Sequence, residues 1–95
     1  MGLTLSDKKD LESLLKFHSL NIEHLINFAK NLLPSQANLE DFAYGLVVGA
    51  IIGNYAEKFV QKHGRSPDND EMMDIYFTMS LRSGKIRKKV LEKLI

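Results

Sequence analysis

Histidine side chains are common ligands of metal ions. The chain contains three histidines, at positions 18, 24 and 63. His18 and His24 are six residues apart, so on one helix their side chains point about 120° away from each other. Two histidines that share a metal ion on one helix face are four residues apart. We therefore predict no metal site, and we interpret the histidines as surface or boundary residues.

A group of carboxylates has part of the pattern of a calcium-binding loop. Such a loop needs oxygen ligands at its first, third and fifth positions, a glycine at the sixth and a glutamate at the twelfth. Asp68 and Asp70 fit the first two positions, but methionines occupy the fifth, sixth and twelfth, namely Met72, Met73 and Met79. We interpret these carboxylates, with Asp74, as negative charge near the positive end of a helix.

The most apolar segment contains three glycines that could be taken for a phosphate-binding loop. Gly45, Gly49 and Gly53 are evenly spaced, whereas the glycines of a dinucleotide-binding loop are unevenly spaced and follow a strand. No Lys-Ser or Lys-Thr pair follows them, and the chain has no cysteine. Since no motif combines an activated nucleophile with a base, we predict a protein without catalytic activity or cofactor.

Length and composition predict one folded domain over residues 1–95. The chain has a mass of 10.8 kDa, 44% hydrophobic residues and only two prolines, which excludes disordered and collagen-like classes. Its net charge of +1 lacks the basic excess of a dedicated nucleic-acid binder. The N-terminus has no apolar segment of a secretory signal, so we expect a cytoplasmic protein. The first six residues also match the pattern for N-myristoylation at Gly2, which stays an alternative.

Hydrophobic residues at intervals of three and four predict an all-α bundle of four helices. The expected helices cover residues 6–33, 39–63, 67–82 and 85–95. Thr4 and Ser6 are candidate caps for the first helix. The polar residues at 18–21 would raise the number of helices to five if they ended a helix, but we favour one bent helix there.

Capping residues set the other predicted boundaries. Asn38 is expected to begin the second helix and Gly64 to end it. Ser66 followed by Pro67 is expected to begin the third helix, since proline is favoured at the first helical position. Ser83-Gly84 is expected to separate the third helix from the fourth.

The three glycines lie on one strip of the predicted central helix, and Ala56 extends it. Each glycine inside a helix costs roughly 0.5–1 kcal/mol relative to alanine. We therefore expect a neighbouring helix to pack closely against the strip. The apolar residues around it, Ile52 among them, predict a helix that is buried on nearly all sides. The apolar run of about 15 residues is too short to span a bilayer.

Two kinds of neighbour could cover the glycine strip. Three other short helices can hardly enclose such a helix, so we favour a homodimer that shares the central helices. The alternative is packing of the first helix of the same chain. The expected interface residues are Gly45, Gly49, Ile52, Gly53 and Ala56.

The predicted third helix carries a broad apolar surface. Most of this surface is expected to pack in the core, but its width and its adaptable methionines also suit an interface with another protein. The candidate partner-binding residues are Met72, Met73, Tyr76, Phe77 and Met79.

The last 14 residues are basic and follow an acidic segment. Residues 82–95 contain six Lys or Arg against Glu92 alone, whereas residues 66–81 contain four acidic residues and no Lys or Arg. We favour attraction between oppositely charged helix faces, within or between chains. The alternative is binding of a polyanion, with the candidate contacts Lys85, Arg87, Lys88, Lys89 and Lys93.

Part of the chain resembles a helix-turn-helix of the sigma-factor region-three type. That family begins its first helix with Gly-Arg-x-Pro and places a serine at the start of the second, as Gly64-Arg65-Ser66-Pro67 and Ser80 do here. The resemblance covers residues 64–95 and implies nucleic-acid binding through the basic residues of the last helix. We favour a protein–protein interaction or oligomerisation module with an unknown protein partner, and nucleic-acid binding is the alternative.

Overall fold

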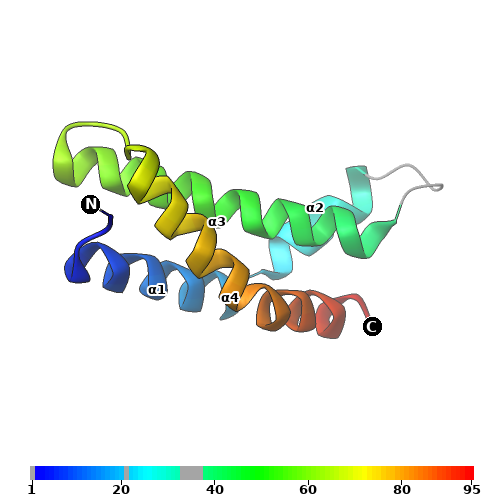
Figure 1. Ribbon diagram of the computed structural model, residues 1–95. Coiled ribbons are helices and arrows are strands. Elements are labelled where there is room, and N and C mark those ends of the chain that lie inside the picture. Colours follow the sequence, from blue (N-terminus) through cyan, green and yellow to red (C-terminus); the bar gives the residue numbers. More distant parts are fainter. Residues whose placement is uncertain (1, 21, 33–37) are drawn as a thin grey trace.

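The computed structural model of the chain describes residues 2–20, 22–32 and 38–95. They form four α-helices, α1 (Leu5–Leu20), α2 (Glu23–Leu32), α3 (Leu39–His63) and α4 (Asn69–Leu94) (Figure 1). No strand occurs in the described residues, so the predicted all-α fold is confirmed. None of the helices in these ranges is both long enough and apolar enough to cross a membrane.

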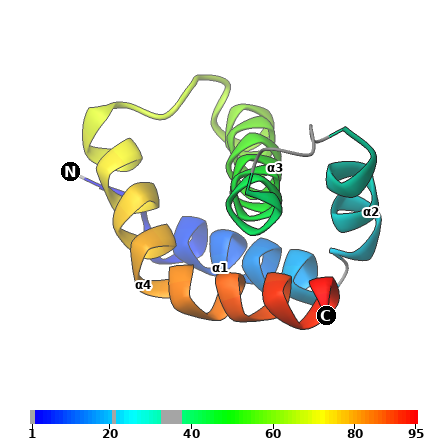
Figure 2. The same cartoon turned by 90° about the vertical axis from the view of Figure 1, so that its right-hand side faces the viewer.

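The helix α3 packs against each of the other helices. The end-on view of Figure 2 shows α4, α1 and α2 around three sides of α3, and no described helix on its fourth side. The chain turns after α3, and α4 runs back along it in the opposite direction (Figure 1). One long helix therefore has a core side and an outer side.

The core lies between α3 and the other three helices. From α3 it takes every fourth residue, and each of these is at most 2% exposed: Ala43, Val47, Ile51, Tyr55 and Phe59. The other helices add apolar residues that are buried against them: Leu11, Leu15, Ile26, Ala29, Ile75, Ile86 and Val90. The core thus covers one side of α3 along its whole length.

The predicted first helix, 6–33, is two helices. α1 ends at Leu20 and α2 begins at Glu23, so the favoured single helix is wrong and the alternative break near 18–21 is correct. Residue 21, and the predicted end of the helix at residue 33, lie outside the described residues. The break lets α1 and α2 contact different parts of α3, and Ile22, Ile26 and Ala29 become buried there. The free energy gained when α1 and α2 each bury an apolar face against α3 exceeds the gain from continuing one helix through the break.

The predicted helices 67–82 and 85–95 are one continuous helix, α4. Ser83 lies inside it, and its hydroxyl donates a hydrogen bond to the carbonyl of Ser80 at 2.9 Å. Ile86 and Val90 continue the buried stripe beyond Gly84, so their burial outweighs a glycine cost of about 1 kcal/mol. Residues 64–95 therefore contain one helix, and the helix-turn-helix that the resemblance implies is not formed.

The predicted caps of α3 are confirmed. The side chain of Asn38 accepts a hydrogen bond from the backbone N–H of Asp41 at 3.0 Å. Gly64 has a φ of 70°, a left-handed conformation that residues with a Cβ rarely adopt. Its N–H donates to the carbonyl of Val60 at 2.7 Å, so the helix ends there as the Gly64 signal predicts.

The start of α4 lies two residues later than predicted. Asp68, not Ser66, is the N-cap, and its carboxylate accepts from the backbone N–H of Glu71 at 2.8 Å. The Glu71 carboxylate accepts from the backbone N–H of Asp68 at 2.9 Å in return. This capping box satisfies two backbone donors at once, which Ser66 and Pro67 cannot do.

Candidate functional site

The glycine strip lies on the outer side of α3. Gly45, Gly49 and Gly53 are two residues from the core positions, which places them about 200° around the helix from Val47 and Ile51. All three glycines are exposed, and no atom beyond the local helix lies within 4 Å of the Cβ that each would carry. Two predictions are therefore wrong. No described helix of the same chain packs on the strip, and α3 is not buried on nearly all sides. The other helices all lie on the core side.

Uncharged residues surround the strip. From Phe42 to Ala56 the helix carries no charged side chain, although an outer helix face normally carries several. Half-buried side chains flank the glycines on both sides: Leu46, Val48, Ala50, Ile52 and Ala56. We call Gly45, Gly49 and Gly53 together with these five residues the outer face of α3. It contains all five predicted interface residues.

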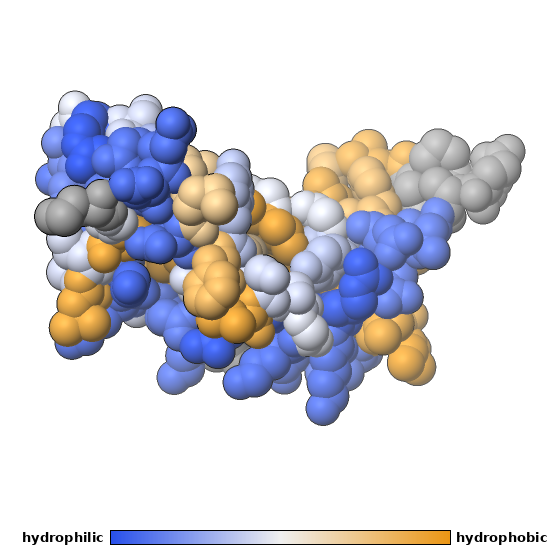
Figure 3. All heavy atoms as spheres, viewed as in Figure 1, coloured by the Kyte–Doolittle hydropathy of each residue, from blue (hydrophilic) through white to orange (hydrophobic). Residues whose placement is uncertain are grey.

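A second apolar surface lies on α4. Met73, Phe77 and Leu81 recur every four residues and are 65%, 64% and 64% exposed, and Tyr76 beside them is 52% exposed. Apolar side chains gather over α4 in the middle of the molecule in Figure 3. These four side chains together expose on the order of 400 Å² of apolar surface, which is about the size of the largest apolar patch on a typical monomer. We call these four residues the α4 row.

The α4 row differs in part from the predicted partner surface. Met73, Tyr76 and Phe77 are exposed as that surface requires, whereas Met79 is buried and Met72 packs against the core. Leu81 was missed. The interval of four residues from Met73 through Phe77 is the signal that would have found it.

Ion pairs within the chain involve most of the predicted polyanion contacts. Arg87 binds Glu40 at 3.2 Å and Asp41 at 2.8 Å. Lys89 lies 3.8 Å from a carboxylate oxygen of Glu92. Lys93 lies 3.7 Å from Glu23, and Arg82 pairs with Glu12. The favoured attraction between charged faces therefore occurs within the chain, but its acidic partners come mostly from α1, α2 and α3 and not from residues 66–81.

Lys85 and Lys88 are exposed on α4. Lys85 lies in a shallow groove with Lys16 of α1, at the point where α1 and α4 meet. The guanidinium of Arg87, in contrast, lies 4.3 Å from the centre of the Tyr44 ring, which fixes it against α3. Lys89 and Lys93 are exposed as well, so of the five predicted contacts Arg87 alone is half-buried.

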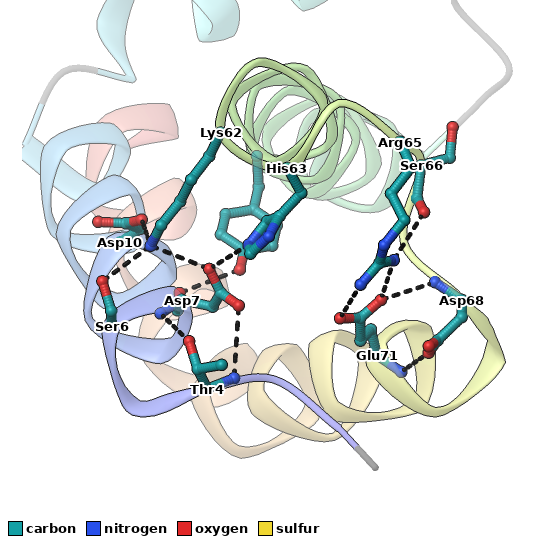
Figure 4. Close-up of polar contacts among 11 residues, drawn as sticks. Thr4, Ser6, Asp7, Asp10, Lys62, His63, Arg65, Ser66, Asp68 and Glu71 are labelled. Carbon is teal, nitrogen blue, oxygen red and sulfur yellow. Dashed lines mark hydrogen bonds and ion pairs between the residues drawn. The ribbon is translucent and has the colours of Figure 1, made fainter.

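Asp7 is the centre of a polar cluster that joins the start of α1 to the end of α3 (Figure 4). Its buried carboxylate accepts hydrogen bonds from His63 Nε2 at 2.8 Å and from Lys62 Nζ at 3.0 Å. Its backbone N–H donates to the Thr4 hydroxyl at 3.1 Å, and its carbonyl accepts from the buried Tyr55 hydroxyl at 3.0 Å. Thr4 thus caps α1, as one of its two candidate caps. The sequence gives no signal for this cluster, because 56 residues separate Asp7 from His63.

The cluster determines the charge of its buried groups. Burial raises the pKa of the Asp7 carboxyl, but hydrogen bonds from His63, Lys62 and Thr4 outweigh it and hold that pKa well below its usual value. Burial, followed by the charge of Asp7, raises the pKa of the Tyr55 hydroxyl. Asp7 therefore stays ionised and Tyr55 stays protonated at neutral pH, as a structural joint between two helix ends requires.

Glu71 forms a second polar cluster, at the turn between α3 and α4 (Figure 4). Both carboxylate oxygens of this buried side chain accept from Arg65, at 2.7 and 3.0 Å, in addition to the capping bond from Asp68. The Arg65 guanidinium, then the Asp68 backbone, lower the pKa of Glu71 to about 2. The Arg65 guanidinium also lies 5.3 Å from the centre of the Phe59 ring. The pair fixes the turn that directs α4 back along α3.

The depressed pKa of Glu71 predicts a loss of stability in acid. Its ionised form is stabilised only in the folded chain, so this contribution is complete above pH 4.5 and is lost as the pH falls from 4.5 toward 2. We expect the urea midpoint to fall over this range, and to fall less steeply in Glu71→Gln, which is less stable at pH 7. Urea titrations of both proteins at several pH values test this. Equal slopes in the two proteins would contradict it.

A cavity of about 550 Å³ lies between α1 and α3. Its polar lining includes Asp10, Ser13 and Glu57, and His18 lies in it with Nε2 2.9 Å from the side-chain nitrogen of Asn54. His18 is buried, so its prediction as a surface or boundary residue is wrong, and burial lowers its pKa. Within the described ranges, no three His, Cys, Asp or Glu residues are placed to hold a metal ion.

Searches of protein families, of curated proteins and of solved structures found no match to the chain. The observations that bear on its function are therefore the outer face of α3, the α4 row and the two polar clusters that hold the helices in place.

Proposed function

We propose that this chain is a small helical module without catalytic activity that binds other protein chains and forms oligomers. It has two apolar surfaces that reach solvent. In the α4 row all four side chains are exposed, and on the outer face of α3 the three glycines are exposed while the side chains that flank them are half-buried. The observation that carries the proposal is the α4 row, in which three large apolar side chains at intervals of four residues are about two-thirds exposed. Such a row on a rigid helix is the pattern by which helices dock into apolar grooves.

The positions of the polar clusters support this proposal. The Asp7 and Glu71 clusters lie at the ends of helices, where they join α1 to α3 and α3 to α4. They hold the two apolar surfaces in fixed positions without occupying them. A rigid exposed surface loses little entropy on binding, so more of the contact energy contributes to affinity.

The nucleic-acid alternative has less support. It required a helix-turn-helix in residues 64–95, and this segment contains a single helix. Arg82, Arg87 and Lys93 already bind carboxylates on other helices. A phosphate backbone would have to compete with these ion pairs for Arg87 and Lys93.

A single charge in the α4 row tests the proposal. We expect Phe77→Glu to reduce recovery of a partner protein more than tenfold when tagged full-length chain is isolated from its native source, because the charge is buried in the interface. Phe77 is 64% exposed, so the variant should fold and keep its helical circular dichroism. Lys88→Glu, an exposed substitution on the same helix, is the matched control and should recover the partner as the wild type does. Recovery of the same proteins by Phe77→Glu and wild type would contradict the proposal.

A further inference from the structure

We infer that the cavity between α1 and α3 binds a small zwitterion of the amino-acid class, with its carboxylate at Asn54 and Lys58 and its apolar side chain against α1. The cavity uses none of the residues of the outer face of α3 or of the α4 row. The inference therefore goes beyond the proposed function.

The cavity lies between two facing rows of side chains. Its volume of about 550 Å³ is within the range of about 300–1,000 Å³ that is usual for small-molecule sites. Asp10 binds Lys62 at 3.1 Å near one end of the α1 row, and His18 contacts Asn54 at 2.9 Å at the other end. These two contacts join α1 to α3, so the walls of the cavity are held in place before a ligand binds.

His18 is buried in one wall of this cavity at a cost that the fold does not require. Its side chain is 6% exposed, and its buried Nδ1 has no hydrogen-bond partner among the described residues. Burial, followed by the charge of His24, lowers the pKa of the ring, so it is neutral at pH 7. A buried polar atom without a partner destabilises a fold, and an apolar side chain of similar size would avoid this cost. We therefore assign His18 to the cavity and not to the core.

The contact of His18 holds Asn54 at the end of the cavity. Since an amide NH₂ group can only donate, His18 Nε2 accepts from Asn54 Nδ2, and the second amide hydrogen of Asn54 stays available as a donor to a ligand. Lys58 lies one helical turn further along the same wall and is exposed. A carboxylate only accepts hydrogen bonds, so it is the group that this amide and this ammonium select together.

The charges in the lining indicate a ligand of both signs. Asp10 already binds Lys62, so Glu57 and Lys58 are the opposite charges that the cavity offers to a ligand. A plain anion would be repelled by Glu57, and a plain cation would be repelled by Lys58. A zwitterion places an opposite charge against each of them.

Two apolar side chains of α1 also line the cavity. Leu14 packs against the core, and Phe17 is 57% exposed. They suit an apolar part of the ligand, since burial of such a surface favours binding. An α-amino acid with an apolar side chain combines the carboxylate, the ammonium group and this apolar part in one small molecule.

Calorimetric titration with L-phenylalanine tests the class of ligand. We expect the chain to bind it with a Kd of about 1 mM or tighter. Hydrocinnamate lacks the ammonium group and phenethylamine lacks the carboxylate, so each should bind at least tenfold more weakly. Lys58→Gln should weaken the binding of L-phenylalanine at least tenfold. Lys88→Gln, at an exposed lysine of α4 outside the cavity, is the matched control and should bind as the wild type does.

His18 has a separate test, because a structural role and a positioning role predict different results. We expect His18→Leu to keep or raise the urea midpoint, since it removes the buried Nδ1 that has no partner, while the affinity for L-phenylalanine falls at least fivefold. A lower urea midpoint, or an unchanged affinity, would overturn the role of His18 in the cavity.

Three results of the titrations would overturn the inference as a whole. They are the absence of L-phenylalanine binding at about 10 mM, equal binding of L-phenylalanine and either of the other two compounds, and equal affinities of the wild type and Lys58→Gln. The proposed function would survive each of them, because Phe77→Glu tests it on a different surface.

Discussion

Replacing all three glycines of the strip by alanine is expected to raise the free energy of unfolding of the monomer by about 1.5–3 kcal/mol. Each alanine lowers the entropy of the unfolded chain and favours the helix by about 0.5–1 kcal/mol. This gain normally fails where the new methyl group meets a neighbour, but nothing beyond the local helix lies within 4 Å of it here. Urea unfolding at a protein concentration low enough to keep the chain monomeric measures the change.

The same substitution distinguishes two accounts of the strip. If the strip were packed against another helix of the same chain, three methyl groups would force the helices apart and lower the stability. A decrease in the urea midpoint would therefore contradict the placement of Gly45, Gly49 and Gly53 on the outer side of α3. Ala50→Gly, a half-buried position on the same face, provides the reverse control and should lower the stability by about 1 kcal/mol.

Replacing Asp7 by alanine is expected to lower the free energy of unfolding by about 3 kcal/mol. The variant loses the hydrogen bonds that the buried Asp7 carboxylate accepts from His63 Nε2 and from the Lys62 ammonium, and a hydrogen bond to a charged group is worth about 1.5 kcal/mol. It also leaves the first turn of α1 without a carboxylate, which weakens that helix end. Urea unfolding at pH 7 measures the loss.

Asp10 offers a matched control for that substitution. It binds the same Lys62 at 3.1 Å, but its side chain is 47% exposed, whereas that of Asp7 is 1% exposed. Asp10→Ala should therefore cost less than about 1 kcal/mol, as exposed ion pairs do. Equal losses in the two variants would indicate that the burial of Asp7 contributes nothing to the joint between α1 and α3.

Capping residues in the sequence predicted the helix ends that depend on hydrogen bonds between near neighbours in the chain. Asn38 and Gly64 specify the bounds of α3 through hydrogen bonds to residues three and four positions away. The errors occur where distant contacts decide. The polar residues at 18–21 and the Ser83-Gly84 pair are both weak signals for the end of a helix. Burial against α3 decides between them: α1 ends at Leu20, whereas α4 continues through Ser83-Gly84.

The spacing of the glycines predicted that they share one strip of α3, but it did not predict on which side of the helix that strip lies. The interval of four residues placed the glycines on one strip, yet a helix that is uncharged from residue 42 to residue 56 has no polar side to mark the solvent. The core side is marked by the buried Tyr55 and Phe59, and the Tyr55 hydroxyl donates to the carbonyl of Asp7 on α1. The Asp7 cluster could not be found, since its members are brought together only by the fold.

Sedimentation equilibrium of the chain is the most direct test of the proposal that it forms oligomers through the outer face of α3. We expect the wild-type mass to rise from 10.8 kDa toward twice that value with increasing concentration. Gly49→Leu should remain at the monomer mass and keep its helical content, because the new side chain projects into the contact and not into the core. A wild-type chain that stays monomeric at millimolar concentration, or a Gly49→Leu variant that dimerises as the wild type does, would contradict the account.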